Sequence, residues 1–251
     1  MTSSPSYAVQ LYTLRDQMAQ DRDGSLRRLA GIGFAEVEPF DPTADPAGFR
    51  AVLDDLGLGV TFTHAYALLR EPERTTEVLD AIATVGASHA IIPGGIPEED
   101  FTDVDGLRRT AEVLNGIAEK AAGHGIRLGY HNHWWEIEPK IDGRHAIEAL
   151  VDHLAPEIFL EIDTYWAAVG GADPVALLER LGERVLALHV KDGPVRKGEP
   201  HVAVGAGAMP VPAILAAAPH AARIVELDEC ATDIFEALAD SHAYVAGLEG
   251  A

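Results

Sequence analysis

Acidic and imidazole side chains stand at the ends of several apolar segments in the second half of the chain. The clearest are His131, His133, Asp163, His189 and Glu226. Burying a carboxylate or an imidazole without a partner is unfavourable, so their recurrence at four successive segments indicates a shared partner. Oxygen and imidazole ligands together suit Mn²⁺, Zn²⁺, Fe²⁺, Co²⁺ or Mg²⁺. The pattern therefore predicts one divalent metal ion, with Asp163 and His189 among its ligands.

Further side chains that could bind a substrate or move a proton lie near the ends of other apolar segments. Glu38 and His64 belong to two segments in the first half of the chain, while Trp135 and Lys191 follow two segments in the second half. Each also has an ordinary structural interpretation, such as a salt bridge, a structural hydrogen bond, aromatic packing or a solvated cation. The spacing alone leaves both interpretations open.

A repeating architecture must bring these residues together. Eight short apolar runs alternate with helical segments, and the runs cover residues 7–11, 35–39, 60–63, 90–93, 127–131, 159–163, 185–190 and 223–227. Runs that are apolar almost throughout are typical of parallel strands covered on both faces. Even spacing, no linker and no Gly-x-Gly-x-x-Gly after the first run favour one α/β domain over residues 1–251. We predict a (β/α)8 TIM barrel with its active site at the carboxyl ends of the strands.

The helices between these runs have readable ends. Asp-Pro pairs at 45–46 and 173–174 open two helices, because the aspartate caps free N–H groups and proline tolerates the first helical position. Gly57 and Gly182 end the same two helices. Apolar residues at helical spacing predict the longest helix over 103–124.

The composition narrows the range of partners. Carboxylates outnumber Lys and Arg by 40 to 19, which gives a net charge of −21. Such a charge argues against nucleic acid as a partner, since binding phosphate backbones requires clustered cations. Cys230 is the single cysteine, and neither a leader-like N-terminus nor an apolar run of about 20 residues is present. We expect a cytoplasmic protein that acts on a small molecule and not at a membrane.

Five segments carry a resemblance to a known family: YAVQLYTLR, LGYHNHWWEIEP, FLEIDTYW, LALHVKDG and RIVELDEC. They resemble the xylose isomerase-like TIM-barrel superfamily, and within it the sugar phosphate isomerase/epimerase branch, to which inosose dehydratases also belong. The resemblance extends from Tyr7 to about Tyr244 and implies the same barrel fold. Family members are often dimers or tetramers, so a homo-oligomer is consistent with it.

The resemblance implies one divalent metal, with Mn²⁺ as the expected ion, held by Glu, Asp, His and Glu from four strands. Asp163, His189 and Glu226 match three of these positions. His131 stands where the first glutamate is expected. Either His131 is the ligand, or Glu136 folds back from the following loop to supply a carboxylate. We favour Glu136, because it restores the set of three carboxylates and one imidazole.

The family chemistry is proton abstraction next to a carbonyl, or a hydride shift. A metal chelated by the substrate would polarise the carbonyl and stabilise an enediolate. An imidazole with a pKa near neutrality suits the proton transfer at pH 7. The expected participants are His131, His133, Glu38 and Lys191 in catalysis, and His64 and Trp135 in substrate binding.

The leading prediction is an enzyme, a metal-dependent isomerase or epimerase of a small sugar, keto-sugar or polyol. A lyase or dehydratase acting on a keto-glycoside or inosose at the same metal site is the nearest alternative. A non-catalytic sugar-binding barrel is more distant, and so is DNA-repair endonuclease IV, which shares the fold but needs several zinc ions and a cationic face. Gly205-Ala206-Gly207 is the closest approach to a phosphate cradle, so an unphosphorylated substrate is at least as well supported as a phosphorylated one.

Overall fold

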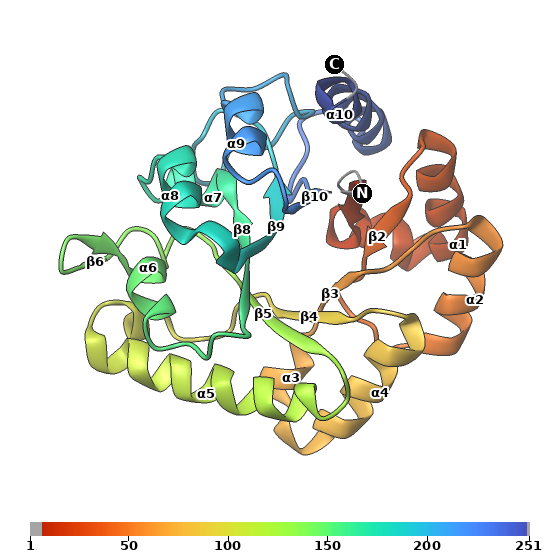
Figure 1. Ribbon diagram of the computed structural model, residues 1–251. Helices are drawn as coiled ribbons and strands as arrows, with labels where there is room; N and C mark the ends of the chain where they lie inside the picture. Colours follow the sequence, from red (N-terminus) through yellow and green to blue (C-terminus); the bar gives the residue numbers. More distant parts are fainter. Residues whose placement is uncertain (1–6, 250–251) are drawn as a thin grey trace.

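Eight parallel strands form a nearly closed barrel surrounded by helices (Figure 1). The computed structural model describes residues 7–249, so the N-terminal stretch 1–6 and the last two residues of the predicted domain lie outside the described part. The strands are β1 (Tyr7–Gln10), β2 (Glu36–Glu38), β3 (Phe62–His64), β4 (His89–Ile92), β5 (Arg127–His131), β8 (Phe159–Asp163), β9 (Val185–Val190) and β10 (Ala222–Val225). Each coincides with one of the eight predicted runs, and the predicted barrel fold is confirmed.

The barrel closes between β2 and β3, which stand at the two ends of the sheet order β2-β1-β10-β9-β8-β5-β4-β3. Here the strands are joined by a few backbone hydrogen bonds and not by a continuous ladder. Val37 N donates to Gly59 O at 3.0 Å, and His64 N donates to Pro39 O at 2.8 Å. We call this junction the β2–β3 seam.

Helices pack around the outside of the barrel (Figure 1). They are α1 (Arg15–Ile32), α2 (Pro46–Leu56), α3 (Ala67–Arg70), α4 (Thr75–Val85), α5 (Val104–Ala122), α6 (Ala146–Val151), α7 (Thr164–Val169), α8 (Pro174–Leu181), α9 (Val211–Ala217) and α10 (Ile234–Glu249). The predicted caps are confirmed: the side chains of Asp45 and Asp173 accept N–H groups of the first turns of α2 and α8. Gly57 follows α2 with a φ of 67°, a conformation that favours glycine.

Strand alternation fills the barrel with two layers of side chains. Residues two apart on a strand face the same side. Nearer the amino ends lies the apolar layer, made of Ala8, Phe62, Ile91, Phe159, Ala187 and Ile224. Above it lies the polar layer, buried throughout and made of Gln10, Glu38, His64, His131, Glu161, His189 and Glu226. On five strands the polar residue comes two positions after an apolar one, so the same alternation positions both layers.

The sequence did not indicate a small hairpin after β5. It consists of β6 (Lys140–Ile141) and β7 (Arg144–His145), which pair antiparallel. Strands of two residues carry too little alternation to be recognised in a sequence. The hairpin leads into α6 and lies outside the barrel (Figure 1).

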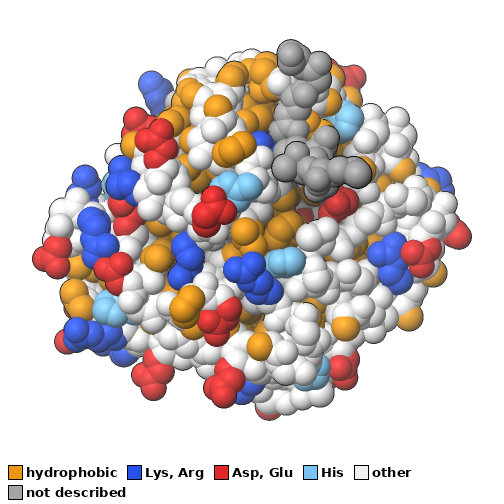
Figure 2. All heavy atoms as spheres, viewed as in Figure 1, with side chains coloured by type: hydrophobic (Ala, Val, Ile, Leu, Met, Phe, Trp, Pro, Cys, Tyr) orange, Lys and Arg blue, Asp and Glu red, His pale blue; other side chains and the backbone are white. Residues whose placement is uncertain are grey.

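The surface follows from this arrangement. Figure 2 shows apolar and imidazole side chains near the middle of one face, with acidic and basic side chains mainly toward its edge. Within residues 7–249, no helix combines the length and the apolar character that crossing a membrane requires.

Candidate metal and substrate site

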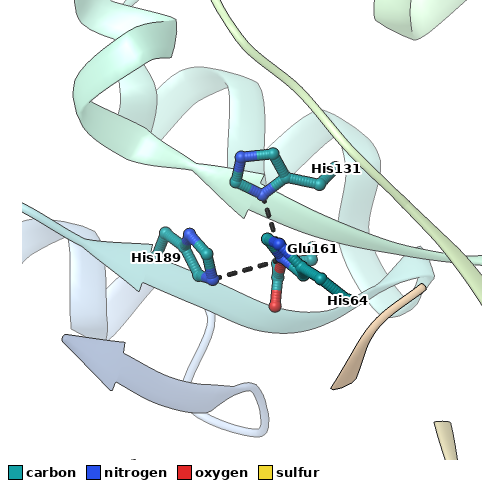
Figure 3. A group of neighbouring side chains, drawn as sticks. All are labelled: His64, His131, Glu161 and His189. Atoms are coloured by element: carbon teal, nitrogen blue, oxygen red, sulfur yellow. Dashed lines mark hydrogen bonds and ion pairs between the residues drawn. The ribbon is translucent and has the colours of Figure 1, made fainter. Parts of the chain in front are cut away.

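Three imidazoles surround the carboxylate of Glu161 in the polar layer. Figure 3 shows His131 of β5 and His189 of β9 directed toward Glu161 of β8. Glu161 Oε2 lies 2.8 Å from His64 Nε2, 3.0 Å from His131 Nδ1 and 3.2 Å from His189 Nε2. Burial alone would raise the pKa of Glu161, but His189 and His64 outweigh it and hold the pKa well below 4.5. Glu161 is therefore a buried anion that accepts from several imidazoles.

His189 is held by carboxylates on both sides of its ring. Its Nε2 lies 2.8 Å from Glu38 Oε2, and its Nδ1 lies 2.7 Å from Glu226 Oε2. Glu38 also accepts from the Gln10 amide at 2.8 Å. Burial, together with the nearby Glu161, raises the pKa of Glu38 to about 7. The carboxylate of Glu38 is thus directed at Gln10 and His189, and Glu38 does not line the cavity described below.

Asp163, His189 and Glu226 form a second cluster at the carboxyl ends of β8, β9 and β10. Their ligand atoms lie within 4.8 Å of one another, as do those of His64, His131, Glu161 and His189. Lys191 Nζ lies 2.8 Å from Asp163 Oδ2 and 2.7 Å from Glu226 Oε2. The lysine also contacts Asp228 at 2.9 Å. A buried ammonium among three carboxylates marks this cluster as a strong cation site.

The donor atoms of the second cluster fit a divalent metal. Asp163 Oδ2 and His189 Nδ1 are buried, and among residues 7–249 neither has a hydrogen-bond partner of good geometry, although each makes an ion-pair contact. Burial raises the pKa of Asp163 to about 6, and Lys191 acts in the opposite direction. Oxygen and imidazole donors are ligands that Mn²⁺ and Zn²⁺ accept. These buried histidine, glutamate and aspartate clusters could bind a divalent metal ion.

Glu136 belongs to neither cluster. Its carboxylate accepts the hydroxyl of Tyr130 at 2.7 Å and the backbone N–H of His133 at 2.8 Å. Burial raises the pKa of Glu136 to about 7. The loop after β5 therefore turns this carboxylate toward its own backbone and not toward Asp163. His131 approaches the second cluster instead, because its Nε2 lies 3.9 Å from Asp163 Oδ2.

A cavity of about 510 Å³ opens above the polar layer. The predicted site residues that line it are His64, His131, His133, Lys191 and Glu226, joined by Asp228. Trp135 does not line this cavity. Its ring stacks behind His133, with centroids 4.3 Å apart and an interplanar angle of 7°.

Two members of the polar layer escaped the sequence interpretation. Glu161 lies inside an apolar run, and Gln10 ends the first strand. The signal for Glu161 was its position two residues before Asp163, which puts both side chains on the same face of β8. Nothing comparable distinguished Gln10 before its contact with Glu38 was known.

The fold and the two clusters can now be compared with known proteins. A family model described as xylose isomerase-like TIM barrel matches residues 26–223. The chain belongs to this family. The predicted family is confirmed, and members of the xylose isomerase-like family that resemble this chain are sugar isomerases, epimerases and dehydratases.

Individual relatives in the family are more distant. An inosose dehydratase from Geobacillus kaustophilus (strain HTA426) is 28% identical over 208 residues, which cover 71% of this chain and 64% of that protein. The chain thus spans less than two thirds of the length of this relative. The solved structure of a sugar phosphate isomerase/epimerase from Parabacteroides distasonis ATCC 8503 has a TM-score of 0.77 at 24% identity, covering 97% of this chain and 94% of that one. An L-ribulose 3-epimerase structure has a TM-score of 0.73 at 16% identity, covering 98% and 95%.

Proposed function

We propose that this xylose isomerase-like barrel is a metal-dependent isomerase or epimerase of a small sugar, keto-sugar or polyol. The proposal depends above all on the two imidazoles that approach Asp163 and Glu226. His131 Nε2 lies 3.9 Å from Asp163 Oδ2, and His189 Nδ1 lies 2.7 Å from Glu226 Oε2. His131, Asp163, His189 and Glu226 would hold the metal, with Mn²⁺ as the expected ion. His131 then takes the place that the sequence interpretation gave to Glu136.

The polar layer supports this ligand set by fixing the imidazole tautomers. A histidine that ligates a metal commonly donates its other ring N–H to a carboxylate. His131 Nδ1 lies 3.0 Å from Glu161, and His189 Nε2 lies 2.8 Å from Glu38. Each contact leaves the opposite ring nitrogen free to donate a lone pair toward the second cluster. Glu38 is therefore a positioning residue in this scheme and not the acid or base that the sequence suggested.

We assign proton abstraction to His133. Its ring lines the cavity, and among the described residues its buried Nδ1 has no hydrogen-bond partner. Burial, with His131 and Lys191 nearby, holds the pKa of His133 well below 6.5. The imidazole is therefore neutral and can accept a proton. Glu136 holds the His133 backbone, and Lys191 directs its ammonium at the substrate oxygens.

The metal, when bound, would polarise the substrate carbonyl and stabilise negative charge on its oxygen. The residues of the cavity then decide the outcome. Return of the proton by His133 to the neighbouring carbon isomerises the sugar, and return of a proton to the opposite face epimerises it.

A dehydratase is the second candidate, and the similarity to an inosose dehydratase supports it. The same base would remove the proton next to the carbonyl. A group on the following carbon would then leave with the bonding electrons, and Lys191 could protonate it. Both reactions therefore need the same ligand set and differ in the fate of the intermediate.

Metal titration tests the ligand set. We expect Glu226→Gln to weaken Mn²⁺ binding at least 100-fold in isothermal titration calorimetry, because it removes a charged ligand. Glu229→Gln is the matched control: the same substitution on the same loop, at a carboxylate whose side chain is 77% exposed. Equal Mn²⁺ affinity in the two variants would contradict the proposed site.

Solvent exchange tests the reaction. Mn²⁺-loaded protein is incubated in D₂O with a panel of ketoses, aldoses and inososes and followed by NMR. Deuterium at the carbon next to the carbonyl is expected for every proposed reaction, and loss of water identifies the dehydratase. A protein that binds Mn²⁺ but exchanges no proton in any of these compounds would leave the non-catalytic barrel as the better interpretation.

A further inference from the structure

We propose that the cavity binds an uncharged sugar that carries an aromatic substituent. The sugar lies toward His131, His133 and Glu226, and the substituent lies between Tyr12 and Tyr66 at the mouth. The orientation of the sugar rests on the proposed function. The choice of substituent rests on the side chains of the mouth itself.

Exposed apolar side chains gather at this cavity. Within residues 7–249, the large apolar side chains left exposed are Tyr12 at 42%, Tyr66 at 41% and Val113 at 43%. Two of these three line the same cavity, together with Phe40. Isolated exposed apolar residues are ordinary, but several around one concave opening indicate a binding surface.

Both tyrosine rings are held in place before a ligand arrives. The Tyr12 ring meets the edge of Phe40, with centroids 5.7 Å apart, and the Arg15 guanidinium lies 4.6 Å from its centroid. The Tyr66 hydroxyl accepts from Arg70 Nε at 2.9 Å. The back of the Tyr66 ring lies so close to Gly95 that a Cβ there would be 2.8 Å from Cε2. Rings fixed in this way lose little entropy when an aromatic group packs on them.

The charges around the cavity disfavour a phosphorylated substrate. Lys191 is the one lysine or arginine that lines it, and its ammonium is already shared among Asp163, Glu226 and Asp228. Asp41 and Glu71 add two more carboxylates to the wall. A phosphate dianion would meet net negative charge here, whereas an uncharged sugar would not.

The loop that could cradle a phosphate is already filled by a carboxylate. Asp192 accepts the backbone N–H groups of Gly193, Gly205, Gly207 and Met209 at 2.8 to 3.1 Å. These include the Gly205-Ala206-Gly207 segment, the closest approach to a phosphate cradle in the sequence. Backbone donors gathered in this way are the means by which barrels of this type bind phosphate. Here they serve an internal anion, so the anion site is not available to a ligand.

Binding of glycosides tests the proposal. Mn²⁺-loaded protein is titrated with phenyl glycosides of glucose, galactose and xylose, and with the methyl glycosides of the same sugars. For at least one sugar, the phenyl compound is expected to bind at least ten-fold more tightly than the methyl compound. Tyr12→Ala and Tyr66→Ala should each reduce that ratio about three- to ten-fold. Val113→Ala removes a similarly exposed apolar side chain on α5 and should leave it unchanged.

Each result decides for or against the substituent. Tighter binding of glucose 6-phosphate than of any phenyl glycoside would overturn the proposal. So would no detectable binding of the phenyl panel, or a phenyl-to-methyl ratio that both tyrosine variants leave intact. Mn²⁺ affinity is measured on the same preparations. Loss of the phenyl preference with intact Mn²⁺ binding sinks this inference alone, whereas failure to bind Mn²⁺ sinks the proposed function.

Discussion

The apolar and polar layers of the barrel interior lie two residues apart on the same strands and behave in opposite ways. Phe159 and Glu161 are neighbours on one face of β8, and both are fully buried. Phe159 packs in the apolar layer against Phe62, with ring centroids 5.8 Å apart. Glu161 is surrounded by imidazoles, and its Oε1 has no hydrogen-bond partner among residues 7–249.

This difference separates stability from binding. A filled apolar layer stabilises the fold through burial and close packing. A layer of buried carboxylates and imidazoles contributes less to the fold, because desolvation offsets much of the attraction between charges. Polar atoms without partners in such a layer are suited to hold something else. The two layers should therefore respond differently to substitution.

The largest expected effect on stability comes from the apolar layer. Phe159→Ala leaves a cavity beside Phe62 and should lower the free energy of unfolding by about 3–5 kcal/mol. Mn²⁺ affinity, measured by calorimetry on the folded fraction, should stay within about two-fold of the parent. A ten-fold loss of Mn²⁺ affinity in this variant would show that the two layers are not separable.

Lys191→Met should lower stability by about 3 kcal/mol in the absence of metal, because it leaves Asp163 and Glu226 buried without their cation. Mn²⁺ should restore much of that loss and raise the melting temperature of this variant more than that of the parent. Lys197→Met is the control, since Lys197 is exposed and lies over the Trp134 ring. If Mn²⁺ raises the melting temperature of Lys191→Met no more than that of Lys197→Met, Lys191 and the metal do not share a site.

Glu161→Gln should weaken Mn²⁺ binding about 10- to 100-fold, equal to about 1.4–2.8 kcal/mol. The amide can donate to His131 Nδ1, which favours the tautomer with its proton on Nε2 and removes the lone pair that a metal needs. Glu157→Gln, at an exposed carboxylate just before β8, is the matched control. Parent-like Mn²⁺ affinity in Glu161→Gln would mean that Glu161 does not position the imidazoles.

The smallest expected effect is a change in pH dependence at Glu136. Burial raises the pKa of this carboxyl from 4.5 to about 7, so the folded protein holds the proton more tightly than the unfolded chain. Its contribution to stability is full below pH 4.5 and is lost as the pH rises through 7. Glu136→Gln should therefore reduce the loss of stability between pH 5 and pH 8 by about 1–2 kcal/mol. Urea unfolding of parent and variant at both pH values measures this, and equal losses would contradict the assignment.

Much of the fold could be predicted because strands covered on both faces are apolar runs with recognisable ends. The runs at 127–131, 159–163 and 185–190 agree with β5, β8 and β9 to the residue. The cluster of Asp163, His189 and Glu226 was predictable for the same reason, since the ends of parallel neighbours meet at one edge. The metal-binding role of the cluster stays a prediction until metal binding is measured.

The remaining features depend on contacts that a sequence does not encode locally. Glu136 was expected to turn toward the metal, but the Tyr130 hydroxyl and the His133 N–H turn it the other way. Trp135 was expected at the substrate, yet an aromatic ring that packs on His133 has the same composition as one that stacks on a sugar. The apolar run around Glu161 concealed a residue that the alternation on β8 could have revealed.

The β2–β3 seam has a kinetic consequence. Its few hydrogen bonds come from residues such as Pro39 and His64, so we expect its amides to exchange with solvent sooner than those of β8 and β9. The segments just after β2 and β3 carry Phe40 and Tyr66, on two sides of the cavity mouth. Breathing of this one seam would widen the entrance while the clusters on β5, β8, β9 and β10 keep their places. A bulky ligand could then enter and leave at a rate set by the seam.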